Sequence, residues 1–252
     1  LRAFGSGFLI FTDYARGSIR LSSIMEIPAL HVWTHDTISL GEDGPTHQPI
    51  EQLSTLRAIP GFTVLRPADA NEAAIAWRVA VEHANGPVGL ALTRQKVPFI
   101  DRTKYGSAEG VAKGAYVLAD PPGGAAPRVV LMSSGSEVQL VMKAQDELAA
   151  KGIPTRTVSM PSMELFAQQT EEYRAQVLPP GVPRVAIEAA HPMSWYKWVG
   201  LDGVVIGLEH FGASAKYEQI YEGFGITTAA VVEAAERLAA QVPAAATSGS
   251  GG

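Results

Sequence analysis

The chain has 252 residues, 46% of them hydrophobic, and this length allows two compact domains with real cores. A net charge of −5 argues against a nucleic-acid-binding protein, and no apolar run approaches the roughly 20 residues that cross a bilayer. The lack of cysteine excludes disulfides and thiolate metal sites, and it suits a cytoplasmic protein.

The two ends of the chain have unusual compositions. The sequence begins at Leu1 without an initiator methionine, and it lacks the basic region of a signal peptide. We therefore expect part of a longer chain, with a first domain that is incomplete at its N-terminus. At the other end, the small residues of 242–252 predict a flexible tail.

In the first half of the chain, short apolar runs alternate with segments of helical period, which is typical of a parallel α/β fold. The predicted strands are Phe8–Phe11, Ala29–Trp33, Thr63–Arg66 and Val88–Leu92. The predicted helices are Tyr14–Met25, Ile50–Ile59 and Asn71–Asn85. Pro49 suits the first turn of the second helix, and Asp69 with Glu72 fits the N-cap of the third.

The same alternation returns after an irregular segment, 95–113, within which we place an interdomain linker at 99–111. The predicted strands that follow are Arg128–Met132, Thr155–Val158, Arg184–Ile187 and Val204–Gly207. The predicted helices are Glu137–Ala150, Thr170–Val177, Ala213–Glu222 and Thr228–Ala240. The sequence thus predicts an α/β protein of two domains, 1–98 and 112–241, each a mostly parallel sheet with flanking helices.

Side chains with chemical function follow the predicted strands of the first domain. Ligands bind at the carboxyl ends of the strands in open parallel sheets, so these side chains should converge on one rim. The first strand leads to Phe11 and Tyr14. The second leads to the loop His35–His47, and the fourth leads to Arg94. We therefore expect a ligand site on this rim.

Two imidazoles, His35 and His47, are the main catalytic candidates. His47 precedes the helix that Pro49 opens, and the positive end of a helix dipole favours a neutral imidazole. A neutral imidazole both donates and accepts hydrogen bonds, as hydroxyl recognition and proton transfer require. A single histidine could equally cap loop backbone, but two histidines in a loop that also carries three carboxylates favour a functional role. Asp36 and Glu42 of the same loop are interpreted as structural.

The other candidates each allow a structural alternative. Asp43, between two glycines, could accept a hydrogen bond from a sugar hydroxyl or form an Asx turn. Arg94 presents a planar fork for phosphate or carboxylate, although a surface ion pair is the simpler explanation from the residue alone. The aromatic side chains Phe8, Phe11 and Tyr14 could stack on a flat ring or pack in a core.

The second predicted domain offers no comparable cluster. Ser133–Ser136, before a predicted helix, could cradle an anion, and capping by Ser136 explains it equally well. The aromatic segment Met193–Trp198 is expected to pack in a core or an interface.

Short motifs spread along the chain together match a known family. They are Phe8–Phe11 with Tyr14–Arg16, Thr34–Asp36, Gly41–Pro49, Thr93–Gln95, Gly135–Val138, Val158–Ser162 and Trp195–Lys197. With these motifs, the chain from about Leu1 to Ala239 resembles transketolases, thiamine-diphosphate enzymes that move two-carbon ketol units between sugar phosphates. The Thr-His-Asp start and His-Gln-Pro end of the substrate loop favour transketolase over its relative, deoxyxylulose-phosphate synthase.

The resemblance implies a domain assignment and a cofactor contact. Residues 1–98 would be the later part of the pyrimidine-binding domain. Residues 112–241 would be the C-terminal domain, which carries no catalytic group in this family. Phe11, backed by Phe8 and Tyr14, would pack against the aminopyrimidine of thiamine diphosphate.

The resemblance also implies roles for the polar residues of the rim. His47 would contact the hydroxyl and carbonyl end of the donor sugar and would serve proton transfers. Asp43 would bind a substrate hydroxyl near the reacting carbon. His35 and Arg94 would hold the terminal phosphate of the sugar.

Other parts of the family's active site lie outside this sequence. These are the acidic residue that activates the aminopyrimidine and the diphosphate-binding domain with its divalent metal, Mg²⁺ or Ca²⁺. By resemblance, the missing part or a partner chain would complete a cytoplasmic homodimer of the pentose phosphate pathway, and this chain alone would be inactive. The alternative is a non-catalytic assembly or regulatory module that keeps the family fold.

Overall fold

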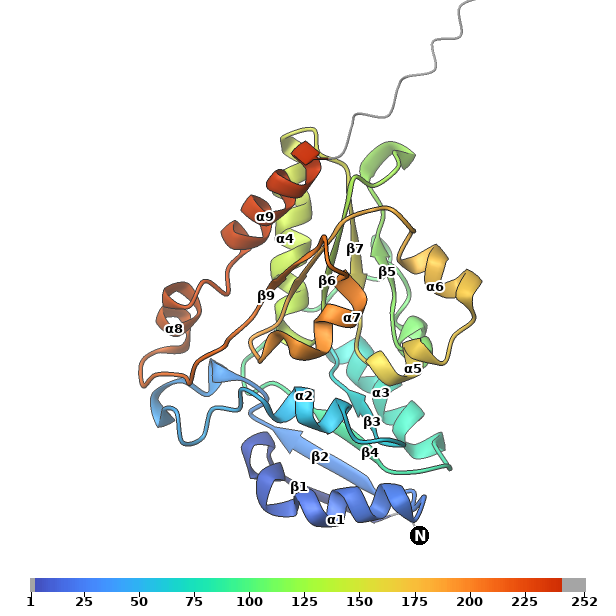
Figure 1. Cartoon of the computed structure of the whole chain (residues 1–252), viewed down its shortest axis with the longest axis vertical. Helices are drawn as coiled ribbons and strands as arrows, with labels where there is room; N and C mark the ends of the chain where they lie inside the picture. Colours follow the sequence, from blue (N-terminus) through green and yellow to red (C-terminus); the bar gives the residue numbers. More distant parts are fainter. Residues whose placement is uncertain (1–2, 242–252) are drawn as a thin grey trace, which may run out of the picture.

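The computed structural model describes residues 3–241, so the predicted flexible tail at 242–252 lies outside the described part. The chain forms two sheets, each flanked by helices (Figure 1). The first sheet has the strand order β1-β2-β4-β3 and is parallel throughout. The second has the order β5-β7-β6-β8-β9, and only β5 runs antiparallel, to β7. The predicted fold class, two mostly parallel sheets with flanking helices, is confirmed.

The strands and helices of the first sheet have short connections. The strands are β1 (Phe4–Phe8), β2 (Leu30–Thr34), β3 (Thr63–Leu65) and β4 (Val88–Ala91). The helices are α1 (Thr12–Ile24), α2 (Gln52–Arg57) and α3 (Ala70–Glu82). The N-cap prediction for α3 is confirmed, because the Asp69 carboxylate accepts from the Glu72 amide at 2.9 Å. The Glu72 side chain in turn accepts from the Ala68 amide.

Two predictions near the rim are wrong by a few residues. The first strand is Phe4–Phe8, and Leu9–Phe11 is a 3₁₀ turn. The strand is defined by its pairing with β2 over a Gly-rich, exposed stretch, so the apolar run marks its end instead. The helix expected to open at Pro49 begins at Gln52, because Pro49 and Ile50 are buried before the chain turns.

The second sheet contains one strand that the sequence pattern did not reveal. Its strands are β5 (Tyr116–Ala119), β6 (Val129–Ser133), β7 (Thr155–Ser159), β8 (Arg184–Ile187) and β9 (Val204–Ile206). Its helices are α4 (Val138–Ala150), α5 (Met163–Ala167), α6 (Glu171–Val177), α7 (Tyr196–Val199), α8 (Tyr217–Gly223) and α9 (Thr228–Gln241). The unpredicted β5, α5 and α7 are each only four or five residues long, too short for a period to show.

The two sheets share a hydrophobic core. We call the part of the chain that ends with β4 the first-sheet half, and the part from β5 onward the second-sheet half. One cluster of buried side chains joins Leu65 and Leu90 of the first sheet to Leu118 and Val138 of the second-sheet half. Val111, in a 3₁₀ segment between the sheets, belongs to the same cluster and is fully buried. The carboxyl end of β3 therefore lies against the second-sheet half of the molecule, and this contact helps to position the site.

Candidate functional site

The aromatic and imidazole side chains predicted for the rim form a continuous row of ring contacts. Phe8 stacks on His35 with 3.8 Å between ring centroids and an interplanar angle of 25°. Phe11 lies 6.0 Å from Phe8, and its ring meets His47 edge-on at 5.7 Å. Tyr14 continues the row at 6.0 Å from Phe11. The structure thus brings together residues from β1, α1 and the loop after β2.

The outer part of this row is open to solvent. Phe11 is 42% exposed and Tyr14 is 89% exposed, while Phe8 is partly buried. Core packing, the structural alternative for these aromatics, does not describe Phe11 and Tyr14. Their side chains instead form an apolar ledge on which a flat ring can stack.

His35 occupies a constrained position between this ledge and the charged residues. Its φ of 59° lies in the left-handed region, which is strained for a residue with a Cβ and is found at functional sites. Its Nδ1 shares a 2.8 Å hydrogen bond with the Thr34 hydroxyl. Partial burial lowers the pKa of His35, the positive charge of Arg94 lowers it further, and Asp43 opposes them. The imidazole is therefore kept neutral near pH 7, with both charged partners close by.

Asp43 and Arg94 line a small pocket of about 170 Å³ next to this histidine. Both side chains are exposed, so neither is tied up in the core. Lys216 and Glu218, from the second-sheet half, line the same pocket. Sequence reasoning missed this lysine, because only the tertiary fold brings residue 216 to the end of β4.

His47 is oriented by its own loop. The Thr46 hydroxyl shares a 2.9 Å hydrogen bond with its Nδ1, and its amide donates to the Gly44 carbonyl. The expectation that a helix end acts on this imidazole is wrong, because α2 begins only at Gln52 and has six residues. Contact with Phe11 and Thr46 places His47 at the rim instead.

The loop that carries Asp43 and His47 rests on the second-sheet half. Gln48 donates to the carbonyls of Gly41 and Ala213 at 2.8 and 3.0 Å. Gly41 has a φ of +80°, and a Cβ there would lie 3.3 Å from the Ala215 carbonyl oxygen. The glycine is thus favoured by its positive φ, and the close approach of Ala215 adds to this constraint.

A buried charge network lies beneath the loop, and the sequence pattern did not reveal it. Arg66, at the end of β3, contacts Asp36 at 2.7 Å, Glu137 at 2.7 Å and Glu188 at 3.2 Å. Glu188 also pairs with Arg57 at 2.7 Å, and all five side chains are nearly inaccessible to solvent. The first-sheet half supplies both arginines and Asp36, and the second supplies the two glutamates, so the network joins the halves.

The predicted anion cradle at Ser133–Ser136 contacts a cation instead. The Ser134 carbonyl accepts from Arg66, and its hydroxyl donates to Glu188. Ser136 donates to the Glu137 carboxylate, so the capping expected of it is absent. The crevice at the carboxyl ends of β6 and β8, where an open sheet would bind a ligand, is filled by a guanidinium of the first-sheet half.

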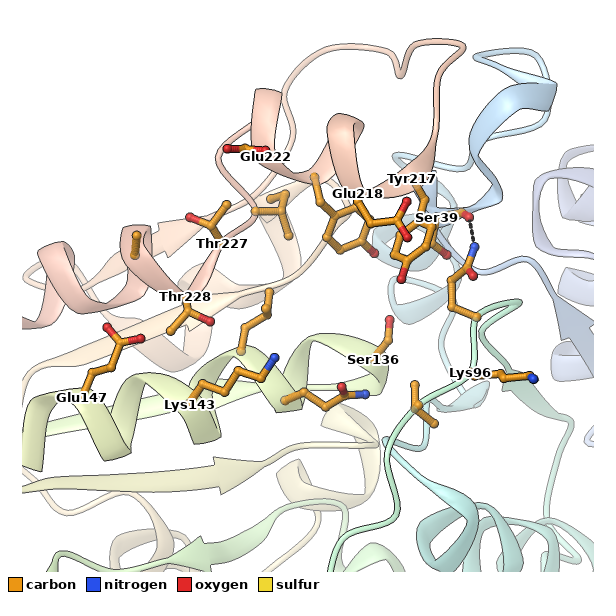
Figure 2. Close-up of a pocket in the computed structure, with 17 residues that line it drawn as sticks. Ser39, Lys96, Ser136, Lys143, Glu147, Tyr217, Glu218, Glu222, Thr227 and Thr228 are labelled. Atoms are coloured by element: carbon orange, nitrogen blue, oxygen red, sulfur yellow. Dashed lines mark hydrogen bonds between the residues drawn. The ribbon is translucent and has the colours of Figure 1, made fainter.

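A larger pocket of about 780 Å³ lies beside the rim, between α4 and the α8–α9 segment (Figure 2). It shares Ser39, Gln95, Tyr217 and Glu218 with the small pocket. Gln95 donates to the Ser39 carbonyl at 2.5 Å, and both residues belong to the walls of both pockets.

Two negative findings concern the described residues 3–241. In that range no group of three or more His, Asp or Glu side chains is arranged to hold a metal ion. The helices in the same range are all too short or too polar to cross a membrane.

A family model described as the transketolase pyrimidine-binding domain matches residues 1–99, and one described as the transketolase-like C-terminal domain matches residues 114–227. A transketolase of Mycobacterium leprae is 52% identical over 242 residues, covering 94% of this chain and 34% of the relative. The chain thus spans about a third of the length of the curated relatives that it matches.

Solved transketolase structures share the fold. The enzyme from Leishmania mexicana superimposes with a TM-score of 0.90 at 41% identity, covering 97% of this chain and 35% of that one. A Pichia stipitis transketolase, solved in complex with sedoheptulose-7-phosphate, gives a TM-score of 0.88 at 41% identity. That match covers 94% of this chain and 34% of the other.

Proposed function

Because the chain belongs to the transketolase family, we propose that it forms the substrate-contacting part of an enzyme that transfers a two-carbon ketol unit between sugar phosphates. The observation that carries this proposal is the convergence of His35, Asp43, His47 and Arg94 beside an exposed aromatic ledge. A scaffold has no physical need for this set of groups. The substrate class is supported by the sugar phosphate bound in the Pichia stipitis relative.

The aromatic ledge fits the pyrimidine ring of thiamine diphosphate. Phe11 and Tyr14 expose flat apolar faces, and Phe8 supports them from the sheet side. When bound, thiamine diphosphate supplies the nucleophilic carbon and the electron sink that the protein's own side chains lack. The divalent metal and the diphosphate would be held by residues outside this chain.

In this proposal, each polar residue of the rim binds a different part of the sugar phosphate. His47 lies against the ledge, and this contact supports a role for its imidazole in exchanging a proton with a substrate hydroxyl near the cofactor ring. Asp43 would accept a hydrogen bond from a hydroxyl further along the sugar. Arg94 and His35 would bind the terminal phosphate, where the planar guanidinium offers two parallel donors.

The remaining parts of the proposal concern the complete enzyme. Since the chain spans a third of its relatives, we expect transfer only when the rest of the family's length is supplied, in the same polypeptide or by a partner. We expect this completed enzyme to be a cytoplasmic dimer that acts in the pentose phosphate pathway.

Replacing His47 tests the proposal. In the completed enzyme with thiamine diphosphate and Mg²⁺, His47→Ala should lower transfer from a ketose phosphate to an aldose phosphate by about a hundredfold or more, the usual contribution of a general acid–base group. The matched control is His83→Ala, because His83 lies at the end of α3, away from the ledge. Equal activity of the His47 variant and the control would refute the proposal.

A further inference from the structure

A closed circuit of polar contacts, buried except at the partly exposed Tyr221, links the second-sheet half to the start of the substrate loop. The Thr37 and Tyr221 hydroxyls share a hydrogen bond of 3.1 Å, and the Tyr221 hydroxyl donates to Glu137 at 2.8 Å. Glu137 pairs with Arg66 at 2.7 Å, and Arg66 donates to Asp36 at 2.7 Å. The circuit thus begins and ends at two neighbouring residues of the loop.

Joining two halves of a protein through buried charged groups costs desolvation free energy. Burial raises the pKa of Asp36 despite the charge of Arg66, and the charges of Glu137 and Glu188 raise it further. One carboxylate oxygen of Asp36 and one terminal nitrogen of Arg66 are buried without a hydrogen-bond partner in the protein. Apolar side chains of similar volume usually stabilise such a contact as well or better, so stability alone does not explain the arrangement.

The residues at the two ends of the circuit control the geometry of the rim. Asp36 directly follows His35, whose left-handed backbone must be held by its surroundings. Thr37 is the N-cap of the 3₁₀ segment Ile38–Asp43, and its hydroxyl accepts from the Ser39 amide. Fixing residues 36 and 37 therefore sets His35 and the start of the 3₁₀ segment, up to the break in its backbone at Gly41.

We propose that Tyr221 and Glu137 of the second-sheet half are positioning residues for the sugar-phosphate site. They act through Thr37 and Arg66, and neither touches the substrate. This inference rests on the proposed function for the identity of the ligand, but the positioning of His35 can be observed without any ligand. The C-terminal domain thereby takes part in substrate recognition, although it carries no group that touches the sugar phosphate in this proposal.

The test removes a single hydroxyl and keeps the aromatic ring. Tyr221→Phe breaks both hydrogen bonds of the bridge, and Tyr173→Phe is the matched control, since its hydroxyl donates only to the Ala115 carbonyl. The first readout is the NMR signals of the His35 ring in the chain without ligand. The second is calorimetric affinity for a ketose phosphate and for the same ketose without phosphate. Thermal unfolding of both variants shows whether the fold is kept.

We expect Tyr221→Phe to shift the His35 signals and to weaken ketose-phosphate binding by about tenfold, because only part of the energy of the two lost hydrogen bonds reaches the site through Thr37 and Arg66. Tyr173→Phe should leave both unchanged at a similar unfolding midpoint. His35 signals that respond equally to the two variants, or to neither, would overturn the inference. If the unmodified chain does not distinguish the two ketoses, the proposed substrate is wrong, and the His35 signals still decide the positioning role.

Discussion

At the scale of single residues, the rim combines one strained imidazole with charged groups that are exposed to solvent. His35 is held by its stacking on Phe8 and by the Thr34 hydroxyl, and its lowered pKa keeps it neutral near pH 7. Arg94 lines the small pocket together with Lys216, and the charge of Arg94 already lowers the pKa of this imidazole. A phosphate placed between them would accept hydrogen bonds from both.

Arg94 should therefore make the site bind phosphorylated sugars more tightly than unphosphorylated ones. Arg94→Gln is expected to weaken binding of a ketose phosphate to the chain by about ten- to a hundredfold, because charge-assisted bonds to the phosphate are lost. Affinity for the same ketose without phosphate should stay constant in calorimetry. Arg20→Gln, an exposed cation on α1, is the control. A parallel loss for both sugars would place the phosphate elsewhere.

At the scale of elements, some boundaries depend on local sequence signals and others depend on tertiary contacts. The cap of α3 is formed by Asp69 and Glu72, three residues apart, so sequence alone predicts it. The end of β1 at Phe8 is defined by pairing with β2, and nothing in the apolar run that follows reveals it. Gly114, between Lys113 and β5, is an extreme case of a tertiary constraint, because backbone of the α5 region lies against it.

Two glycines with similar φ values allow the effect of this contact on stability to be measured. Gly114 and Gly152 have φ values of +85° and +74°, but a Cβ at Gly114 would lie 2.2 Å from the Phe166 nitrogen, whereas Gly152 has open space. Gly152→Ala should cost about 1 kcal/mol of unfolding free energy. Gly114→Ala should cost about 3 kcal/mol or more, since backbone must move. Urea denaturation compares the two, and equal losses would mean that the α5 segment yields easily.

At the scale of the whole molecule, the buried charges join the two halves into one structure. Burial alone would raise the pKa of Glu188, but the charges and hydrogen bonds of Arg57 and Arg66 and the Ser134 hydroxyl lower it to about 2. A carboxylate with a lowered pKa stabilises the folded state above its unfolded value, 4.5. That stabilisation is lost as the pH falls from about 4.5 to about 2.

The pH dependence of the free energy of unfolding should reveal whether Glu188 is ionised in the folded protein. At neutral pH, Glu188→Gln is expected to lower the free energy of unfolding by about 3 to 5 kcal/mol, because two buried guanidinium groups lose a counter-charge. About 3 kcal/mol of that difference should disappear between pH 5 and pH 2, as the native carboxylate takes up its proton. Urea unfolding of both proteins across this range gives the difference. A difference that stays constant with pH would show that Glu188 is not held ionised by the arginines.

The sequence by itself determined the α/β class, most strands and long helices, and the identity of the rim residues. These features depend on periodicity, on capping pairs such as Asp69 and Glu72, and on short motifs, all of which lie within a few neighbouring positions. The convergence of His35, Asp43 and Arg94 also followed from the rule that parallel strands place their carboxyl ends together.

Only the tertiary structure decided how the rim is held. Arg66 and Glu188 are 122 residues apart, and Tyr221 lies 184 residues from Thr37, so no local pattern links them. The same holds for Lys216 beside Arg94 and for the edge strand β5. Their placement depends on how two sheets pack around a shared core, and that packing sums many weak contacts between distant segments.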